Sequence, residues 1–388
     1  MRFLHAFLVV ALLAGCAAAP IRLSPLPEKF ADIAAIPGVP GARHWGDSAP
    51  PTIEEWGSLD RAALAKRVPG IMDRPHHYLA LSGGGPNGAF GAGVLVGWTV
   101  HGTRPEFTMV TGVSTGALIA PFAFLGPKYD ATLRKLYTEM STSDILERRS
   151  LLDIVRNDSI ASSAPLLRLI ARYVDDQVIA ELAEQHRRGR KLVIGTTNLD
   201  ADRPVSWNLT RIAASGSPQA KALIHRVLLA SASIPGVFPP VMFEVDADGR
   251  RFDEMHVDGG VTAQVIVYPG GLDWREVGRA LNVIGKPKLY LINNSHTTGI
   301  WQEMDQRIVP ILLRTIDALI RTQGNGDIAQ IFLLSQRDGI DFNLAYIPRT
   351  FTEQPNEQFD PVYMRKLFEL GFEMAKQGYP WVTQWQKR

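Results

Sequence analysis

Two segments between residues 76 and 125 follow one pattern, and this pattern constrains the fold more than any other feature of the chain. In each, a short apolar run (77–82 and 107–111) is followed at once by a glycine cluster (83–88 and 112–116). A stretch of small apolar residues then follows each cluster. Apolar runs of this length, bounded by glycines, predict buried strands, and the stretches after them predict helices.

Further strands are predicted at residues 191–197, 205–208, 250–257 and 288–293. Strands that alternate with helices form a mostly parallel sheet that is covered on both faces. The sequence therefore predicts the α/β class, as a three-layer α/β/α sandwich with a mostly parallel central sheet. No segment after residue 76 has the composition of a linker, so we expect a single catalytic domain over residues 53–388.

The second glycine cluster, Gly112-Val113-Ser114-Thr115-Gly116, has the pattern of a nucleophile elbow. Such an elbow is a tight strand-to-helix turn that exposes a serine hydroxyl, and side chains at its two glycines would clash with neighbouring strands. The first amides of the following helix point toward the place where negative charge develops in acyl transfer. The pattern predicts Ser114 as a nucleophile, with Gly112 and Gly116 as the elbow glycines.

The first glycine cluster, Gly83-Gly84-Gly85-Pro86-Asn87-Gly88, formally satisfies the dinucleotide-binding pattern G-x-G-x-x-G. That alternative needs an acidic residue at the end of the next strand, but the strand at 107–111 ends in the elbow. Bare backbone amides that approach a substrate oxygen suit an oxyanion hole instead. The candidates for this role are Gly83, Gly84, Gly85 and Gly88.

An aspartate followed by two glycines, Asp258-Gly259-Gly260, comes directly after the predicted strand at 250–257. In isolation, an Asp-Gly pair most often marks an ordinary turn. The strand before it is also able to deliver the carboxylate to one end of the sheet, which makes Asp258 a candidate base.

Three blocks in this order, residues 82–88, 112–116 and 258–259, resemble the signature of the patatin-like phospholipases. Two more blocks resemble the same family: residues 196–205, with Thr-Thr-Asn-Leu-Asp and Arg-Pro-Val, and residues 230–240, which end in Pro-Gly-Val-Phe-Pro-Pro. The resemblance extends over about residues 77–265, and its five blocks are more specific than any single motif.

This resemblance implies a lipid acyl hydrolase that acts on phospholipid or other lipid esters with a Ser–Asp dyad and without a metal or cofactor. Asp258 would take the proton of Ser114 as its Oγ attacks an ester carbonyl, and the amides of Gly84 and Gly85 would hold the oxyanion. One position departs from the family, which usually has Arg or Lys where this chain has Asn87. The rate and the head-group preference are the properties that we expect this change to affect.

Other interpretations stay open from the residues alone. The chain order Ser114, Asp258, His296 is that of an α/β-hydrolase with a Ser–His–Asp triad, although Gly84 lies only one strand–helix unit before the serine. His256 shares the strand face of Asp258, and we expect it to be structural. A non-catalytic lipoprotein that binds lipid or assists envelope assembly is the non-enzymatic alternative.

The N-terminus has the features of a bacterial lipoprotein signal. Arg2 precedes an apolar run that is shorter than the ~20 residues of a membrane span, and the run ends in Leu-Ala-Gly-Cys16, similar to a lipobox. We expect residues 1–15 to be a signal peptide and Cys16, the single cysteine of the chain, to carry the lipid. The competing cleavage site after Ala19 is disfavoured by the proline that follows it.

The rest of the chain fits an anchored enzyme of the cell envelope. Residues 16–52 are rich in Pro, Ala and Gly, which predicts a tether. Ala17 resembles the residue that permits sorting to the outer membrane. The 41 Lys and Arg residues nearly balance the 39 Asp and Glu residues, so the net charge of +2 gives no electrostatic footprint for nucleic acid. The expected partners are a lipid substrate and the membrane.

Overall fold

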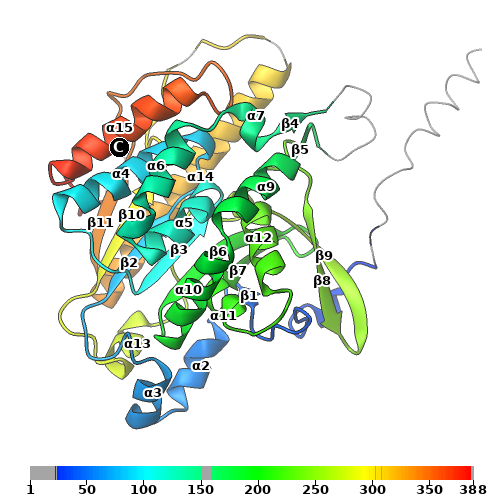
Figure 1. Cartoon of the computed structure of the whole chain (residues 1–388), viewed down its shortest axis with the longest axis vertical. Coiled ribbons are helices and arrows are strands. Elements are labelled where there is room, and N and C mark those ends of the chain that lie inside the picture. The colour runs from blue at the N-terminus through cyan, green and yellow to red at the C-terminus, as the bar shows by residue number, and fades with distance from the viewer. Residues whose placement is uncertain (1–21, 23, 150–158, 302, 307, 386–388) are drawn as a thin grey trace, which may run out of the picture.

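A computed structural model describes residues 22, 24–149, 159–301, 303–306 and 308–385 (Figure 1). In this part of the chain nine strands form one sheet in the order β1-β7-β6-β3-β2-β10-β11, with β9 beside β6 and β8 beside β9. The five strands from β6 to β11 in this order are parallel, and β1, β7, β8 and β9 add antiparallel pairs. The bounds are β1 Arg43–Trp45, β2 His77–Leu81, β3 Met109–Val113, β6 Lys191–Asn198, β7 Arg203–Asn208, β8 Val241–Ala247, β9 Arg250–Asp258, β10 Lys288–Asn293 and β11 Asp341–Tyr346.

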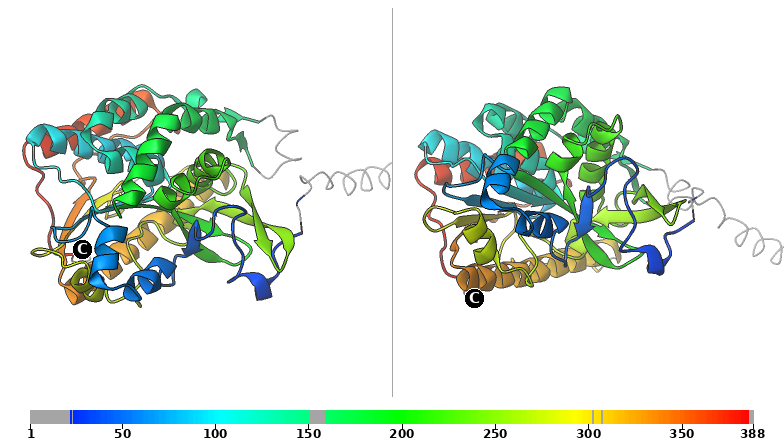
Figure 2. Two further views of the ribbon diagram at one scale, coloured as in Figure 1. Left: turned by 60° about the horizontal axis from the view of Figure 1, so that its bottom comes forward. Right: turned by 90° about the horizontal axis from the view of Figure 1, so that it is seen from below.

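Helices cover both faces of this sheet, which confirms the predicted three-layer α/β/α class. Along β2, Leu79 and Leu81 enter the core on one face, whereas Tyr78 and Ala80 enter the core on the other. Figure 2 shows the long helix α14 along one side of the sheet and most other helices on the opposite side. The larger face carries α4 Gly88–His101, α5 Thr115–Leu125, α6 Asp130–Thr138, α9 Ala164–Tyr173, α10 Asp176–Arg187, α12 Ala220–Ser231 and α15 Pro361–Lys376; the other face carries α13 Trp274–Ala280 and α14 Ile308–Asp338.

The shorter elements complete the connections. They are α2 Pro51–Gly57, α3 Arg61–Arg67, α7 Thr142–Ile145, α11 Leu209–Ala213, the two-stranded pair β4 Glu147–Arg148 and β5 Ala161–Ser162, and the 3₁₀ turns η1 Glu28–Phe30, η2 Gly85–Asn87, η3 Pro127–Tyr129 and η4 Gly259–Val261. The antiparallel hairpin of β8 and β9 extends the sheet beyond its parallel strands.

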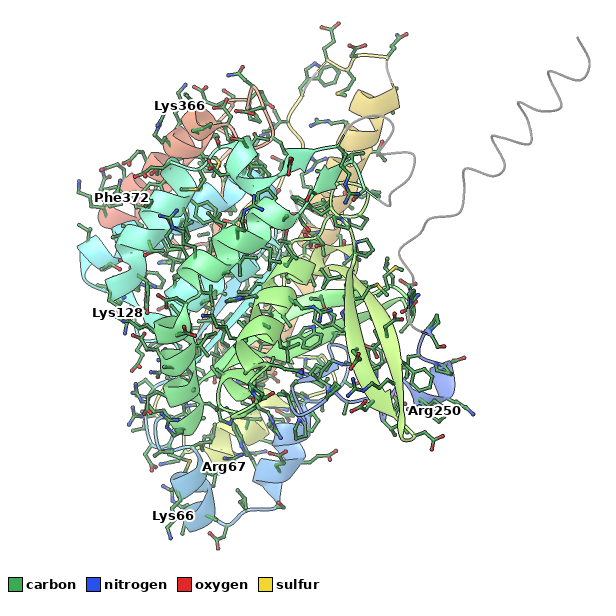
Figure 3. All side chains as sticks on the ribbon, turned by 45° about the vertical axis from the view of Figure 1, so that its right-hand side comes forward. Lys66, Arg67, Lys128, Arg250, Lys366 and Phe372 are labelled. Carbon is green, nitrogen blue, oxygen red and sulfur yellow. The ribbon has the colours of Figure 1, made fainter. Side chains whose placement is uncertain are left out.

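Helix α4 belongs to the larger face and is apolar on all sides, as expected for a helix that is covered all round. It packs on the sheet and against α6 and α15. Phe372, labelled in Figure 3, belongs to α15, and its ring centroid lies 4.8 Å from the guanidinium of Arg134 on α6. This outer layer therefore holds together partly through aromatic and cation–π contacts.

The described part of the predicted tether, residues 22 and 24–52, is packed on the domain. Pro25 and Ala35 form single bridges with Asp253 and Asp246 of the hairpin, and β1 pairs with β7 as the edge strand of the sheet. Many prolines prevent long regular elements but leave short bridges possible. Cys16 and the predicted signal peptide lie outside the described residues. Within those residues, no helix has both the length and the apolar character needed to cross a bilayer.

Candidate active site

Strand β3 passes into helix α5 through Ser114, whose backbone has φ 54° and ψ −125°. A non-glycine residue rarely adopts a positive φ, and such strain persists only where the surrounding structure enforces it. The elbow glycines allow this tight turn. A Cβ at Gly112 would lie 2.5 Å from the carbonyl oxygen of Gly116, and a Cβ at Gly116 would lie 2.4 Å from that of Leu81.

The C-terminal end of α12 supports both predicted catalytic residues. The amide of Ser114 donates to Oγ of Ser231 (3.0 Å), and that hydroxyl donates to the carbonyl of Gly195 on β6 (2.6 Å). The amide of Asp258 donates to the carbonyl of Ser233 (2.9 Å). The Ser/Ala-rich block noted in the sequence therefore joins the elbow to the end of β9.

The fold brings Asp258 beside Ser114. Asp258 ends β9 opposite Thr196 of β6, and β6 is the neighbour of β3. Its Oδ1 accepts a hydrogen bond from the amide of Gly260 (2.8 Å), whereas its Oδ2 is buried with no hydrogen-bond partner among the described residues. The Ser114 hydroxyl interacts with this carboxylate without reaching full hydrogen-bond geometry at Oδ2.

Burial dominates the electrostatics of this carboxylate and raises the pKa of Asp258 to about 7. The interactions with Ser114 and with the Gly260 amide act in the opposite direction but do not offset the burial. A carboxyl group with a pKa near neutrality is suited to accept a proton and return it within one catalytic cycle.

The glycine loop lies against the elbow, and a Cβ at Gly83 would be 3.3 Å from that of Ser114. Gly84 and Gly85 have φ values of 153° and 54°, and no hydrogen bond from either amide is found within the described ranges. The other two predicted oxyanion donors, Gly83 and Gly88, have amides that already donate within the protein. The Gly83 amide donates to the carbonyl of Gln264 (3.0 Å), and the Gly88 amide donates to carbonyls of its own turn. Two of the four glycines therefore have amides that are available to an oxyanion.

A family model described as Patatin-like phospholipase matches residues 79–269, a span that contains the elbow, the glycine loop and Asp258. These residues belong to the patatin-like phospholipase family. Membership supports a lipid hydrolase in general terms.

Solved structures similar to this chain include VipD from Legionella pneumophila, with 13% identity and a TM-score of 0.39 over 78% of this chain and 66% of that one. The type III effector protein ExoU has 14% identity and a TM-score of 0.18, over 78% of this chain and 53% of that one. The match thus spans less than two thirds of the length of either protein. No curated protein sequence matches the chain.

In this patatin-like domain, Asn87 lies at the start of α4 where the family usually has a cation. Its Oδ1 accepts a hydrogen bond from the Tyr363 hydroxyl of α15 (2.6 Å). The amide side chain therefore ties the glycine loop to the C-terminal helix, and the backbone of the loop keeps its open amides.

The two histidines that the sequence analysis considered, His256 and His296, interact with groups other than Ser114 and Asp258. His256 is fully buried; its Nδ1 bonds to Thr196 Oγ1 (2.9 Å) and its Nε2 to Glu254 Oε2 (3.1 Å), in agreement with the predicted structural role. His296 interacts with the backbone of Ile347, and burial lowers its pKa. Across the described residues, no contact joins His296 to Asp258, so the described contacts do not assemble a Ser–His–Asp triad.

Gln264, which sequence reasoning did not single out, connects the two halves of the patatin-like site. Its carbonyl accepts from the Gly83 amide (3.0 Å), and its Nε2 donates to the carbonyl of Gly260 (2.6 Å). Its own amide donates to Asp327 of α14 (2.7 Å). No local pattern marks a glutamine in a loop for this role, because two of these partners, Gly83 and Asp327, are distant in sequence.

An apolar cavity of about 80 Å³ opens beside Ser114 and Gly85. Its walls come from α5, α6, α9 and α12 and are almost wholly hydrophobic; they include Leu118, Phe122, Leu136, Met140, Leu166 and Ile170. Within the described residues, no group of three or more His, Cys, Asp or Glu side chains is placed to hold a metal ion.

Proposed function

We propose that this chain is a membrane-anchored serine lipid acyl hydrolase, a phospholipase or esterase, in which Ser114 and Asp258 act as a dyad. One observation carries the proposal: a strained serine lies beside a buried carboxylate of raised pKa, at the mouth of an apolar cavity. A packing role alone does not explain why an unpartnered carboxylate oxygen is buried beside a hydroxyl.

In the proposed reaction, Ser114 Oγ attacks the ester carbonyl carbon while its proton passes to Asp258. The carbonyl oxygen becomes an oxyanion that the amides of Gly84 and Gly85 and the N-terminal end of α5 stabilise. The tetrahedral intermediate then expels the alcohol, which takes the proton from Asp258. Asp258 takes a proton from water as the resulting hydroxide attacks the acyl-enzyme, and returns this proton to Ser114 Oγ as the acyl–oxygen bond breaks; the carboxylic acid leaves and ionises in solvent.

The lining of the cavity beside Ser114 supports an acyl chain as the part of the substrate that is bound there. Burial of each methylene in such a site contributes about 0.8 kcal/mol. A lipid ester that places its acyl chain in this cavity brings its carbonyl to the serine and leaves its head group toward solvent.

The direct test is a hydrolysis screen of lipid classes with the full chain and with Ser114→Ala and Asp258→Asn. Both variants should lose at least about a thousandfold in rate, whereas Ser143→Ala and Asp248→Asn, exposed positions away from the site, should not. His296→Ala separates the two mechanisms, because only a triad loses most of its rate there. Full activity in Ser114→Ala would refute the proposal.

The non-catalytic alternative has its own signature. A fluorophosphonate probe should label the wild type and leave Ser114→Ala unlabelled, because only an activated serine reacts readily with it. Absence of labelling, together with absence of hydrolysis across the screen, would favour a lipid-binding or envelope-assembly role instead.

We also propose that the chain is anchored by lipid on Cys16, most simply in the outer membrane of a bacterial cell envelope. The support comes from the lipobox-like sequence and from Ala17 after it. In the native host, Cys16→Ser should abolish the acyl mass increment on the N-terminal peptide and release the protein from the membrane fraction. Separation of inner and outer membranes on a density gradient tests the location.

A further inference from the structure

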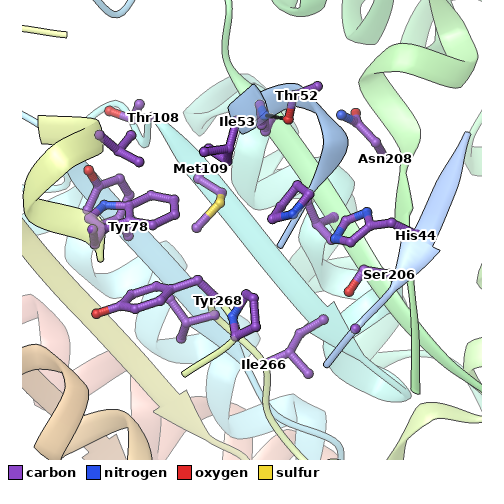
Figure 4. Close-up of a pocket in the computed structure, with 18 of the residues that line it drawn as sticks. His44, Thr52, Ile53, Tyr78, Thr108, Met109, Ser206, Asn208, Ile266 and Tyr268 are labelled. Atoms are coloured by element: carbon purple, nitrogen blue, oxygen red, sulfur yellow. Dashed lines mark hydrogen bonds between the residues drawn. The ribbon is translucent and has the colours of Figure 1, made fainter. Parts of the chain in front are cut away.

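A second and larger cavity, of about 380 Å³, lies at the opposite end of the central strands (Figure 4). Its walls include the first residues of β3 and β6, together with helix α2, the loop 262–270 and parts of α13 and α14. Tyr78 and Met109, which line it, belong to the core on the α14 face of the sheet. The cavity beside Ser114 belongs to the other face, so the two are separate sites.

The walls of this cavity differ in chemistry from one side to the other. Figure 4 shows mostly aromatic and apolar side chains on one side, with Thr108 beside them, and mostly polar side chains on the other, with Ile53 beside them. The first group includes Tyr78, Met109, Ile266 and Tyr268, and the second includes His44, Thr52, Ser206 and Asn208. A cavity of this size with a mostly apolar side and a mostly polar side suits an amphipathic small molecule.

Lys191 supplies the charged group on the polar side. Its Nζ donates to Thr52 Oγ1 (2.7 Å) and lies 4.2 Å from the ring centroid of Trp56. An ammonium group has three donors, and among the described residues no ion pair within 4 Å includes this one; the carboxylate of Glu55, which pairs with Arg211, acts on it at longer range. Burial lowers the pKa of Lys191 to about 8, which still leaves it mostly protonated at neutral pH.

The other charged groups of the lining already have partners. Arg211 pairs with Glu55 (3.4 Å), and Asp47 pairs with Arg203 (2.6 Å). Asp327 accepts the amides of the loop 262–270, and burial raises its pKa to about 6. Among the described residues the cavity therefore contains one ammonium group without a carboxylate in contact, whereas buried charges are normally paired directly.

We propose that this cavity is a binding site for a straight-chain monocarboxylate, a fatty acid, with its carboxylate on Lys191 and its chain along the apolar wall. A single negative charge matches the single unpaired ammonium. A carboxylate can accept one hydrogen bond from Lys191 Nζ and one from the Thr52 hydroxyl, so this site needs no bidentate guanidinium group. An alkyl chain fills the side formed by Met109, Ile266 and Tyr268. The proposal does not depend on hydrolysis at Ser114.

The test is calorimetric titration of the full chain with decanoate, and with 1-decanol as the uncharged probe of the same length. Lys191→Met keeps the stem over Trp56 and removes the charge, so it should weaken decanoate binding at least about tenfold. Lys191→Arg keeps the charge and should retain most of the affinity. Lys288→Met is the matched control, because Lys288 begins the parallel strand β10 but is exposed, and it should leave binding unchanged.

Ile53→Trp fills the cavity from α2 and should abolish binding even if Lys191→Met does not fold. A diazirine-bearing fatty acid locates the site directly, with crosslinks expected in residues 44–56 or 262–274. Equal affinity for 1-decanol, unchanged affinity in Lys191→Met, or crosslinks confined to the segments 118–145 and 166–174 would each overturn the proposal.

Discussion

Replacing Asp258 with Asn should stabilise the protein at alkaline pH while abolishing the proposed activity. In the folded protein, burial moves the pKa of this carboxyl from 3.8 to about 7. Because the folded state holds the proton more tightly than the unfolded state, the charged form costs stability. The cost starts to accumulate above pH ~4 and is complete above the folded pKa of about 7. At 1.4 kcal/mol per pH unit, it reaches about 4 kcal/mol.

Urea unfolding at pH 5 and pH 8.5 measures this effect. Relative to Asp258→Asn, the wild type should lose about 3 kcal/mol between the two pH values, because part of the total has already accumulated at pH 5. The neutral amide keeps the acceptor for the Gly260 amide and removes the buried charge. Asp248→Asn, an exposed aspartate in the turn between β8 and β9, is the control and should show no such difference. An equal gap between wild type and Asp258→Asn at both pH values would refute the electrostatic reasoning.

Three further outcomes follow from the same geometry. The kcat/KM for a short-chain ester should rise with pH through a midpoint near 7, because the proposed base must be deprotonated; a rate that is flat from pH 5 to 9 would exclude Asp258 as the base. Gly116→Ala should lower the free energy of unfolding in urea by at least about 2 kcal/mol, because its Cβ would lie 2.4 and 2.6 Å from backbone oxygens. In the control Gly57→Ala the new Cβ has nothing within 4 Å, so this variant should be neutral or stabilising. Gln264→Ala should lower kcat by about 10- to 100-fold and displace the pH midpoint, with little change in Tm; an unchanged kcat and pH profile would limit Gln264 to packing.

The features that the sequence predicted well are those with a local physical cause. The turn at Ser114 needs small residues on both sides, so its glycines are visible as a motif, and the apolar runs of β2, β3 and β6 reflect burial on both faces. Asp258 is a candidate base from the sequence because a predicted strand leads directly to it and because the family resemblance includes it. In each case the residues that enforce the structure are neighbours in the chain.

The features that the sequence missed depend on where a backbone group points or on distant partners. Gly83 and Gly88 have the composition of oxyanion donors, but their amides are engaged by Gln264 and by the local turn. The direction of an amide is set by tertiary contacts, which composition does not encode. Likewise, the proline-rich composition of residues 24–52 predicts a tether but gives no periodic signal for where it packs, because its bridges to the hairpin of β8 and β9 depend on distant partners.

The segment after residue 269 contributes to the site although the family match and the sequence resemblance end near there. Asp327 of α14 accepts the amides of Gln264 and Val265, and so fixes the loop that holds Gly83 and the Asp258 turn. Tyr363 of α15 holds Asn87 at the other end of the glycine loop. A fragment that ends at residue 269 would lack both of these contacts. The catalytic geometry proposed for the patatin-like domain therefore depends on helices outside its recognisable sequence.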